Sequence, residues 1–489
     1  MRPDQTVSAS PPATSLEKAV LIHTTLYFIG ATWAFGGNAL YVRPYLGAWG
    51  TLGIFLTLWI LGSKESAGKR SRLLRSLWPM LAFNALTAIA CCRIGFRAIH
   101  SGTDLMYLPR QVPFWLPSSA LPGDALWGLW LFDGMYFSAF NLSAIVRTRA
   151  RLRRLLVIML VNTLALAVFG TLQKLVHANG LFFGRVHSPQ VYFFSTFIYD
   201  NHWAAFIILM TGVGLSLIWH YADRADERGF FNSPAFGGSV ALLFLFITVP
   251  LSGARICSGL LLVFLVVSLL RWVYRQQRRR TDVEGGKTSG LWAVAAVAGF
   301  LLAGAGATWF VAQESITQRA EKTVVQVGEF KSMHGLGSRT EVYGDTWRMA
   351  KARFLFGWGM DSFPTVFQMY NTVDINRQDN LPQFYRDAHS DWLQSLAEHG
   401  LVGTLLLGCC ALVPLLTMGA AAWTNRLARY CYAGCGVVLL YAWVEFPFGN
   451  YAVVLTWYLI FFAAARYGVL SPQRSRASSH DPAAPAAEG

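Results

Sequence analysis

Charge is scarce in this sequence. Charged residues make up 14% of the 489 residues, whereas hydrophobic residues make up 54%. A soluble protein of this length needs more charge to cover its surface, so the composition excludes that class. Apolar runs of about 20 residues recur along the chain, which is the length a helix needs to cross a bilayer and too long for barrel strands. The sequence therefore predicts an all-α fold: a polytopic transmembrane helical bundle with about twelve spans.

Cysteine is also scarce, and its placement argues against a disulfide framework. All seven cysteines lie inside or at the ends of apolar runs, and none stands in a loop long enough to need a disulfide. No run has the paired Cys or His spacing that zinc needs. We therefore expect the cysteines to be small packing residues, and we expect neither a metal site nor a cofactor.

The apolar runs divide the chain into segments. Residues 1–17 and 469–489, rich in small polar residues, Ala and Pro, are expected to be disordered tails. Nine spans are expected within 18–311, a large loop at 312–400 and three further spans within 401–468. The expected spans lie near residues 19–39, 47–63, 76–96, 127–146, 155–172, 197–218, 238–253, 255–274, 291–311, 401–423, 431–448 and 451–468.

The net charge of +15 indicates topology rather than nucleic-acid binding. Much of it lies in short clusters between spans: Lys64 to Arg75, Arg147 to Arg154 and Arg271 to Arg280. Short loops rich in Lys and Arg stay on the cytoplasmic side of a membrane. This rule places both termini in the cytoplasm and the 312–400 loop on the extracytoplasmic side.

The long loop is the part of the chain outside the spans that is large enough to form a small domain. Ser338 and Glu341 form a capping-box pattern, which predicts a helix start, and an apolar stripe from Val342 to Phe354 follows. The sequence GWG at 357–359 should break this helix. A second helix is expected to begin near Asp387 and to continue into the tenth span after Gly400.

Ionisable residues inside the spans gather on one side. With the predicted topology, all of them fall in the outer half of the membrane: Asp133, Asp200, His202, Arg255 and Glu445. Any one of them can be a satisfied structural group. Their one-sided clustering favours a polar crevice that opens outward beneath the loop, and thus an enzyme that handles a negatively charged, lipid-borne substrate. A transporter is less favoured because it binds near the midplane between repeats, and the sequence shows no convincing repeat.

Several motifs resemble, in order, those of the O-antigen ligase and polymerase superfamily. They are GR at 184–185 with STFIYDNH at 195–202, LSGAR at 251–255, Arg339 with Trp347 and GWG at 357–359, and RDAHSDWLQ at 386–394 with EHGLVG at 398–403. The resemblance covers roughly residues 160–403. Ser390 stands where many members of the superfamily have Asn.

The resemblance implies transfer of a glycan from a polyprenyl diphosphate carrier to an acceptor hydroxyl, without a metal. Arg185 and Arg255 are the candidates for holding the diphosphate, because arginine binds phosphate oxygens bidentately. His389 is the candidate general base, because histidine titrates near neutral pH. The alternatives are that His389 caps its helix and that the two arginines are interfacial anchors.

Further residues have weaker assignments. Asn201 and His202 either bind substrate or cap the sixth span, and Arg339 and Arg386 are either diphosphate contacts or solvated charges. Gln394 and Glu398 are expected to brace the loop. The expected location is a bacterial inner membrane, among membrane lipids and without nucleic acid. Lipid A core, a growing glycan and a protein remain open as acceptors, so ligase and polymerase both remain. A polysaccharide flippase and an assembly subunit are the non-enzymatic alternatives.

Overall fold

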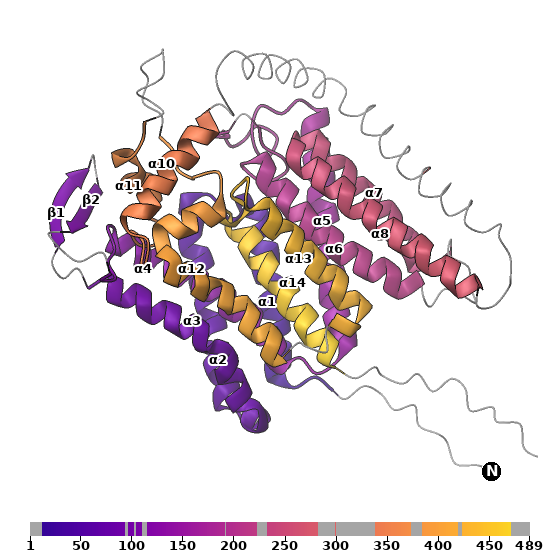
Figure 1. The fold of residues 1–489 in the computed structure, drawn as a ribbon. Helices are drawn as coiled ribbons and strands as arrows, with labels where there is room; N and C mark the ends of the chain where they lie inside the picture. Colours follow the sequence, from indigo (N-terminus) through magenta and orange to yellow (C-terminus); the bar gives the residue numbers. More distant parts are fainter. Residues whose placement is uncertain are drawn as a thin grey trace, which may run out of the picture.

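A bundle of long helices dominates the computed structural model of the chain (Figure 1). It describes residues 12–92, 96–101, 104–109, 115–190, 192–222, 232–281, 299, 338–372, 384–418 and 423–470. The helices that enclose the bundle core or lie over it are α1 (Ser15–Trp33), α2 (Arg43–Gly62), α3 (Arg70–Ala90), α4 (Pro122–Ile145), α5 (Arg149–Leu175), α6 (Asp200–Ala222), α7 (Pro234–Ser252), α8 (Arg255–Thr281), α10 (Ser338–Ala352), α11 (Phe363–Val366), α12 (Asp391–Met418), α13 (Arg426–Tyr441) and α14 (Tyr451–Val469).

The predicted spans correspond to helices wherever the structure describes them. The ninth, at 291–311, lies outside the described residues apart from Gly299. Among the described residues, eight helices are long and apolar enough to cross a membrane. The helices α1, α4 and α13 are not among these eight. The count of about twelve spans therefore stays a prediction. The described residues form a multi-pass helical membrane protein.

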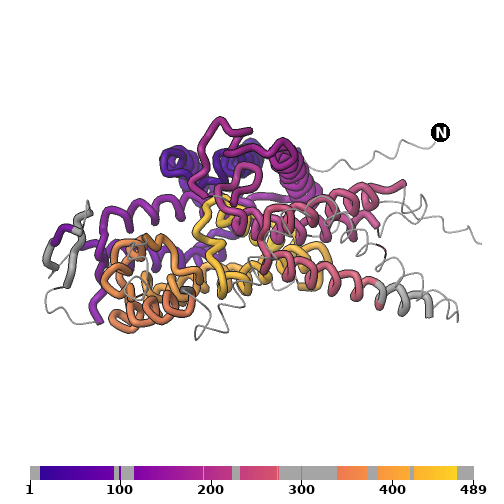
Figure 2. Tube along the Cα trace, turned by 90° about the horizontal axis from the view of Figure 1, so that it is seen from above, coloured from indigo at the N-terminus to yellow at the C-terminus, as the bar shows by residue number. Residues whose placement is uncertain are grey.

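A β-hairpin departs from the all-α prediction. The third predicted span was expected to reach residue 96, but α3 ends at Ala90, and the antiparallel strands β1 (Phe96–Ser101) and β2 (Asp104–Pro109) follow. Arg93 and Arg97 interrupt the apolar run here, and Gly102 stands between the strands, as is typical of hairpin connections. The hairpin and α8 lie at opposite ends of the molecule in both views (Figures 1 and 2).

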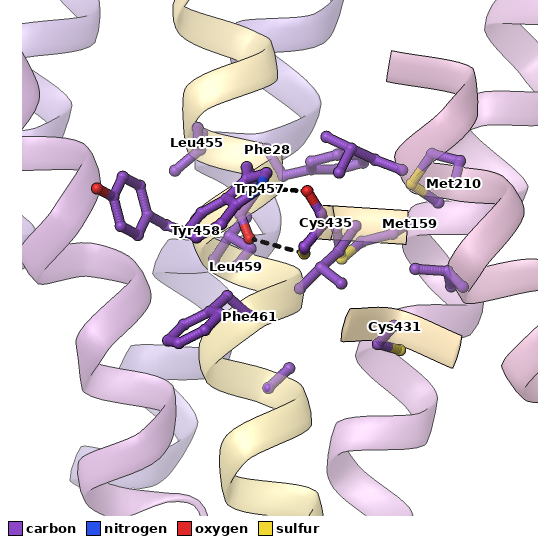
Figure 3. Packing of buried hydrophobic residues seen from close by; sticks show 14 of the residues in the cluster. Phe28, Met159, Met210, Cys431, Cys435, Leu455, Trp457, Tyr458, Leu459 and Phe461 are labelled. Atoms are coloured by element: carbon purple, nitrogen blue, oxygen red, sulfur yellow. Dashed lines mark hydrogen bonds between the residues drawn. The ribbon is translucent and has the colours of Figure 1, made fainter. Parts of the chain in front are cut away.

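The core of the bundle is packed around α6 and α14, which are buried along most of their length. Trp457 of α14 donates its indole N–H to the carbonyl of Cys435 on α13, at 3.1 Å, and Cys435 Sγ lies 3.8 Å from the carbonyl of Trp457 (Figure 3). All seven cysteines are free thiols, and Cys257, Cys410, Cys431 and Cys435 are buried. The expectation that cysteine fills small spaces in the core is confirmed for these four.

One end of the bundle gathers the start of α1 and the end of α14. Glu17 accepts a hydrogen bond from the backbone of Arg147, and Arg466 donates to the carbonyl of Val146. The basic cluster from Arg147 to Arg154 thus lies at this end. The starts of α6 and α14 and the end of α13 lie at the opposite end, as the contacts of Glu445 described below require.

The loop segment that follows α8 packs on this opposite end. Its described part begins with α10 at Ser338, where the capping box predicts a helix start, and Val342, Met349 and Ala350 are buried as the apolar stripe predicts. Together with Trp358, Phe363 and Phe367 they form a second hydrophobic cluster, apart from the main core of the bundle.

The motifs GWG and EHG meet at a break in α12. Gly400 adopts φ 65° and ψ −175°, which interrupts the helical hydrogen bonds around it. The freed backbone groups are used by the loop: Trp358 N donates to Ala397 O at 3.0 Å, and Leu401 N donates to Phe354 O at 2.8 Å. The loop is therefore joined to a membrane span by backbone hydrogen bonds, which fixes its position over the bundle.

This junction leaves no room for a side chain at Gly400. A Cβ atom there would lie 2.4 Å from the backbone carbon of Leu355, and the φ angle disfavours any L side chain. We expect Gly400→Ala to cost about 1–3 kcal/mol or more and to lower the melting temperature of the purified protein, measured by tryptophan fluorescence. Gly408→Ala on the same helix meets no atom within 4 Å and should leave the melting temperature unchanged or slightly raised. Equal effects of the two substitutions would contradict this account of the junction.

Candidate functional site

A buried carboxylate lies at the centre of the candidate site. Glu445 follows α13, is 2% exposed, and accepts hydrogen bonds from Arg339 Nη2 at 2.5 Å and from Asn201 Nδ2 at 3.2 Å. His389 Nδ1 lies 3.6 Å from its other oxygen. A carboxylate buried in this way is costly unless charged and polar partners compensate it. Its partners come from α6, from α10 and from the segment before α12, so Glu445 joins three parts of the chain that are distant in sequence.

Arg339 is the cationic partner of this carboxylate. Burial alone would lower the pKa of the Arg339 guanidinium, but the charge of Glu445 outweighs that effect and raises the pKa above its ordinary value. The arginine therefore stays charged in the folded protein. Its side chain is 40% exposed, so the guanidinium lies between the buried carboxylate and the outer surface.

The turn after α13 holds the segment that carries His389. The backbone N–H of Asp391 donates to the carbonyls of Ala442 and Glu445, and its side chain accepts from Phe448 N at 2.8 Å. Pro447 breaks the helical path of the chain there and begins a short 3-10 turn. These three bonds fix the start of α12 directly beside Glu445.

His389 itself does not cap α12. The cap is Ser390, whose hydroxyl accepts a hydrogen bond from Leu393 N. Serine, like asparagine, is a good N-cap. His389 adopts φ 55°, and its carbonyl accepts a bond from the Tyr343 hydroxyl.

This backbone conformation directs the His389 ring toward Glu445. Nδ1 is buried and makes no hydrogen bond among the described residues, and neither does the Glu445 oxygen that lies 3.6 Å from it. The ring is 31% exposed, so its accessible part lies away from Nδ1. A carboxylate at Nδ1 stabilises the tautomer whose Nε2 can accept a proton, which is the arrangement of a general base.

The start of α6 supplies further residues that contact Glu445 and the turn after α13. The buried His202 lies 3.2 Å from the carbonyl of Phe446 through Nε2, and Asn201 donates to the Tyr199 hydroxyl as well as to Glu445. The rings of Tyr199, His202 and His389 surround Phe446 at centroid distances of 5.0–5.3 Å. For Asn201 and His202 the sequence left substrate binding and helix capping as alternatives. Both residues make contacts within this site.

The structure places the other three predicted site residues differently. Arg255 is the exposed first residue of α8, two residues after the left-handed Gly253 that caps α7. Arg185 is exposed in a tight turn between the paired residues Leu181 and Val186. Arg386 lines a cavity beside the site. The described contacts therefore unite His389, Asn201, His202 and Arg339, but not these three arginines.

A cavity of about 480 Å³ lies next to the start of α12. The loop residues Met360, Asp361 and Pro364 line it together with residues of α2, α3, α4, α12, α13 and α14. Sequence reasoning expected a crevice formed by the ionisable residues of the spans, but the cavity is lined by different ones. Asp133 instead lies beside Asn84, and Asp200 accepts from the backbone of Asn201. No three His, Cys, Asp or Glu side chains in the described ranges are arranged to hold a metal ion.

Sequence reasoning missed two features of this region. Glu445 was noted as a charge within a span but was not assigned to the site, and the signal that could have identified it is its position just before the helix-breaking Pro447. Tyr343 gave no signal, since nothing in the sequence indicates that α10 turns this hydroxyl toward His389. Gln394 and Glu398 brace the loop as expected: they accept hydrogen bonds from the backbone N–H groups of Ala388 and Phe363.

Two carboxyl groups of the cavity make folding stability depend on pH. Burial raises the pKa of Asp361 and of Asp387 to about 6, against the combined effect of nearby cations. The folded state therefore binds these protons more tightly than the unfolded state does. Ionisation of the two carboxyl groups above about pH 6 lowers the free energy of unfolding. This destabilisation disappears as the pH falls and the groups become protonated. We expect the double variant Asp361→Asn/Asp387→Asn to melt at a higher temperature than wild type at about pH 7.5, with the difference shrinking toward about pH 5.

The control for this measurement is Glu65→Gln, which changes a partly exposed carboxylate paired with Arg147. It should not reproduce the pH-dependent difference. A double variant that is less stable than wild type across the whole pH range would contradict the assignment.

Comparison with known proteins supplies the family. A family model described as O-antigen ligase matches residues 240–408, a range that runs from α7 into α12 and includes Arg255, Arg339, Arg386 and His389. A search of curated protein sequences gave no significant match. The resemblance drawn from the motifs is thus supported over residues 240–408, where the chain is similar to the O-antigen ligase family.

Proposed function

We propose that this protein is a membrane glycosyltransferase that moves a glycan from a polyprenyl diphosphate carrier to an acceptor hydroxyl. The observation that carries the proposal is the position of His389, which lies in the segment that matches the O-antigen ligase family and whose Nδ1 is 3.6 Å from the buried Glu445. A histidine oriented by a carboxylate is a recurrent arrangement for taking a proton from a hydroxyl nucleophile.

The chemistry assigns one task to each part of the site. The acceptor oxygen forms a bond to the first carbon of the glycan, the bond from that carbon to the diphosphate oxygen breaks, and the hydroxyl proton moves to His389 Nε2. Glu445 stabilises the imidazolium that results. The carrier leaves as a polyprenyl diphosphate, and an in-line displacement of this kind inverts the configuration at the glycan carbon.

Arginines are proposed to stabilise the negative charge that develops on the diphosphate. Arg185, in a turn, and Arg255, at the start of α8, are both exposed, and guanidinium groups suit bidentate contacts with phosphate oxygens. Cys257, two residues after Arg255, lies beside the hydroxyl of Tyr441, so α8 begins at the same end of the bundle as Glu445. Arg339 is engaged by Glu445 and is proposed to position that carboxylate, with its exposed part toward the substrate.

The site is proposed to face the extracytoplasmic side of a bacterial inner membrane. It lies at the end of the bundle opposite the basic cluster from Arg147 to Arg154, and such clusters stay in the cytoplasm. The same geometry disfavours a flippase, which needs charged groups along a path through the membrane. The deep part of the cavity is lined instead by apolar residues such as Met135, Leu407 and Ala411.

Ligase and polymerase chemistry share this site, and both remain candidates. A ligase transfers the glycan once to a lipid A core or a protein, whereas a polymerase extends a growing glycan repeatedly. The two reactions differ in the size of the product, which makes them separable in one experiment.

The test uses the purified protein, a short glycan on polyprenyl diphosphate, and a panel of acceptors that includes lipid A core, free glycan and peptide. We expect release of the lipid diphosphate by wild type and a loss of about 10²–10⁴-fold in His389→Ala, because that is the usual contribution of a general base. A single conjugate would identify a ligase, and a ladder of products would identify a polymerase.

The matched control is His100→Ala, which removes an exposed histidine on the hairpin, away from the site. This variant should release the diphosphate at the wild-type rate. Absence of release from every donor and acceptor with wild type, or an unchanged rate in His389→Ala, would overturn the proposal.

A further inference from the structure

The cavity beside His389 is divided into a polar rim and an apolar interior. The rim is formed where the loop, the start of α12 and the outer ends of α2 and α4 meet. Its ionisable residues are Arg43, Asp124, Asp361, Arg386, Asp387 and Asp391. Asp387 and Asp391 flank His389 in the chain, two residues before and after it, so the rim lies next to the proposed catalytic base without including it.

The interior of the cavity lies at membrane depth. Phe132 and Met135 of α4, Leu407 and Ala411 of α12 and Tyr458 of α14 line it. Ala411 lies about 16 Å beyond Gly400 along α12, at a rise of about 1.5 Å per residue, which is roughly half of a hydrocarbon core of about 30 Å. An apolar space of this depth suits a hydrocarbon chain better than a glycan.

The volume is sufficient for such an occupant. Ligand cavities span about 300–1,000 Å³, and this one measures about 480 Å³. On the other face of α12, Leu405 is 60% exposed. The helix thus separates the cavity from the outside of the bundle along this stretch.

Carboxyl groups outnumber cations among the described residues that line the cavity. Asp124, Asp361, Asp387, Asp391 and Glu398 stand against Arg43 and Arg386. Burial, with a contribution from Asp124 and Asp387, raises the pKa of Asp361 to about 6 against the effect of Arg43. A diphosphate would add negative charge to this region, whereas sugar hydroxyls can donate hydrogen bonds to carboxylates.

We infer that this cavity binds the acceptor, and that the acceptor is an amphiphile with a hydrocarbon chain and an uncharged, hydroxyl-rich head. The chain occupies the apolar interior, and the head lies among the rim carboxylates with one hydroxyl directed toward His389. The inference rests on the proposed transferase function. It gives the two substrates different binding sites: the arginines outside the cavity bind the diphosphate of the donor, and the cavity binds the acceptor. Acidic groups at the rim would then select against acceptors whose heads carry phosphate.

Binding without donor tests the inference separately from catalysis. The probes are a fluorescent alkyl disaccharide with a chain of about ten carbons and the same molecule with a phosphate on its head, each titrated into the protein in nanodiscs. Wild type should bind the neutral probe at least about tenfold more tightly, a difference of about 1.4 kcal/mol. The double variant Asp361→Asn/Asp387→Asn should lose most of that preference.

A matched pair of variants on α12 tests the apolar interior. Leu407→Trp fills the cavity and should weaken binding of the alkyl disaccharide about tenfold or more, whereas Leu405→Trp enlarges a side chain on the outer face and should have no effect. Leu407→Trp should leave the KM for the polyprenyl diphosphate donor unchanged.

The outcomes separate the two ideas. Selective binding of the neutral probe by a protein that transfers no glycan would keep this inference and overturn the proposed function. Failure to bind the neutral probe, equal effects of Leu407→Trp and Leu405→Trp, or a change confined to the donor KM would overturn the inference.

Discussion

The structure of the site depends on one interaction, the burial of the Glu445 carboxylate among cationic and polar partners. A carboxylate at 2% exposure must be compensated, and Arg339, Asn201 and His389 are the groups that surround it. Because each partner belongs to a different part of the chain, this requirement brings the start of α6, the loop helix α10 and the segment before α12 together. The same contacts orient the His389 ring, so the electrostatic constraint and the proposed catalysis share one geometry.

A second constraint fixes the position of the loop relative to the membrane spans. The break at Gly400 exposes backbone groups within α12, and the chain around Trp358 satisfies them. A membrane helix tolerates such a break where protein, rather than lipid, supplies the missing hydrogen bonds. The loop is therefore fixed at both ends of the site: at α12 by backbone bonds and at α10 by Arg339 and Tyr343.

The sequence predicted those features that depend on local patterns. Hydropathy located the helices from α1 to α8 and from α12 to α14, and the capping box located the start of α10 at Ser338. It did not predict the hairpin at 96–109, because the apolar run before it continued past the end of α3. The partnership of Glu445 with Asn201 spans 244 residues, and the acidic rim joins four segments. Such pairings depend on how helices pack, which hydropathy does not encode.

The central claim is that Glu445 and His389 act as one unit, and a double-mutant cycle tests it most directly. The rate of lipid diphosphate release would be measured for wild type, Glu445→Gln, His389→Gln and the double variant under one set of conditions. Residues that act as a unit are strongly non-additive, so the double variant should be no slower than His389→Gln alone. Losses that multiply, so that the double variant is slower by the product of the two single effects, would contradict the account.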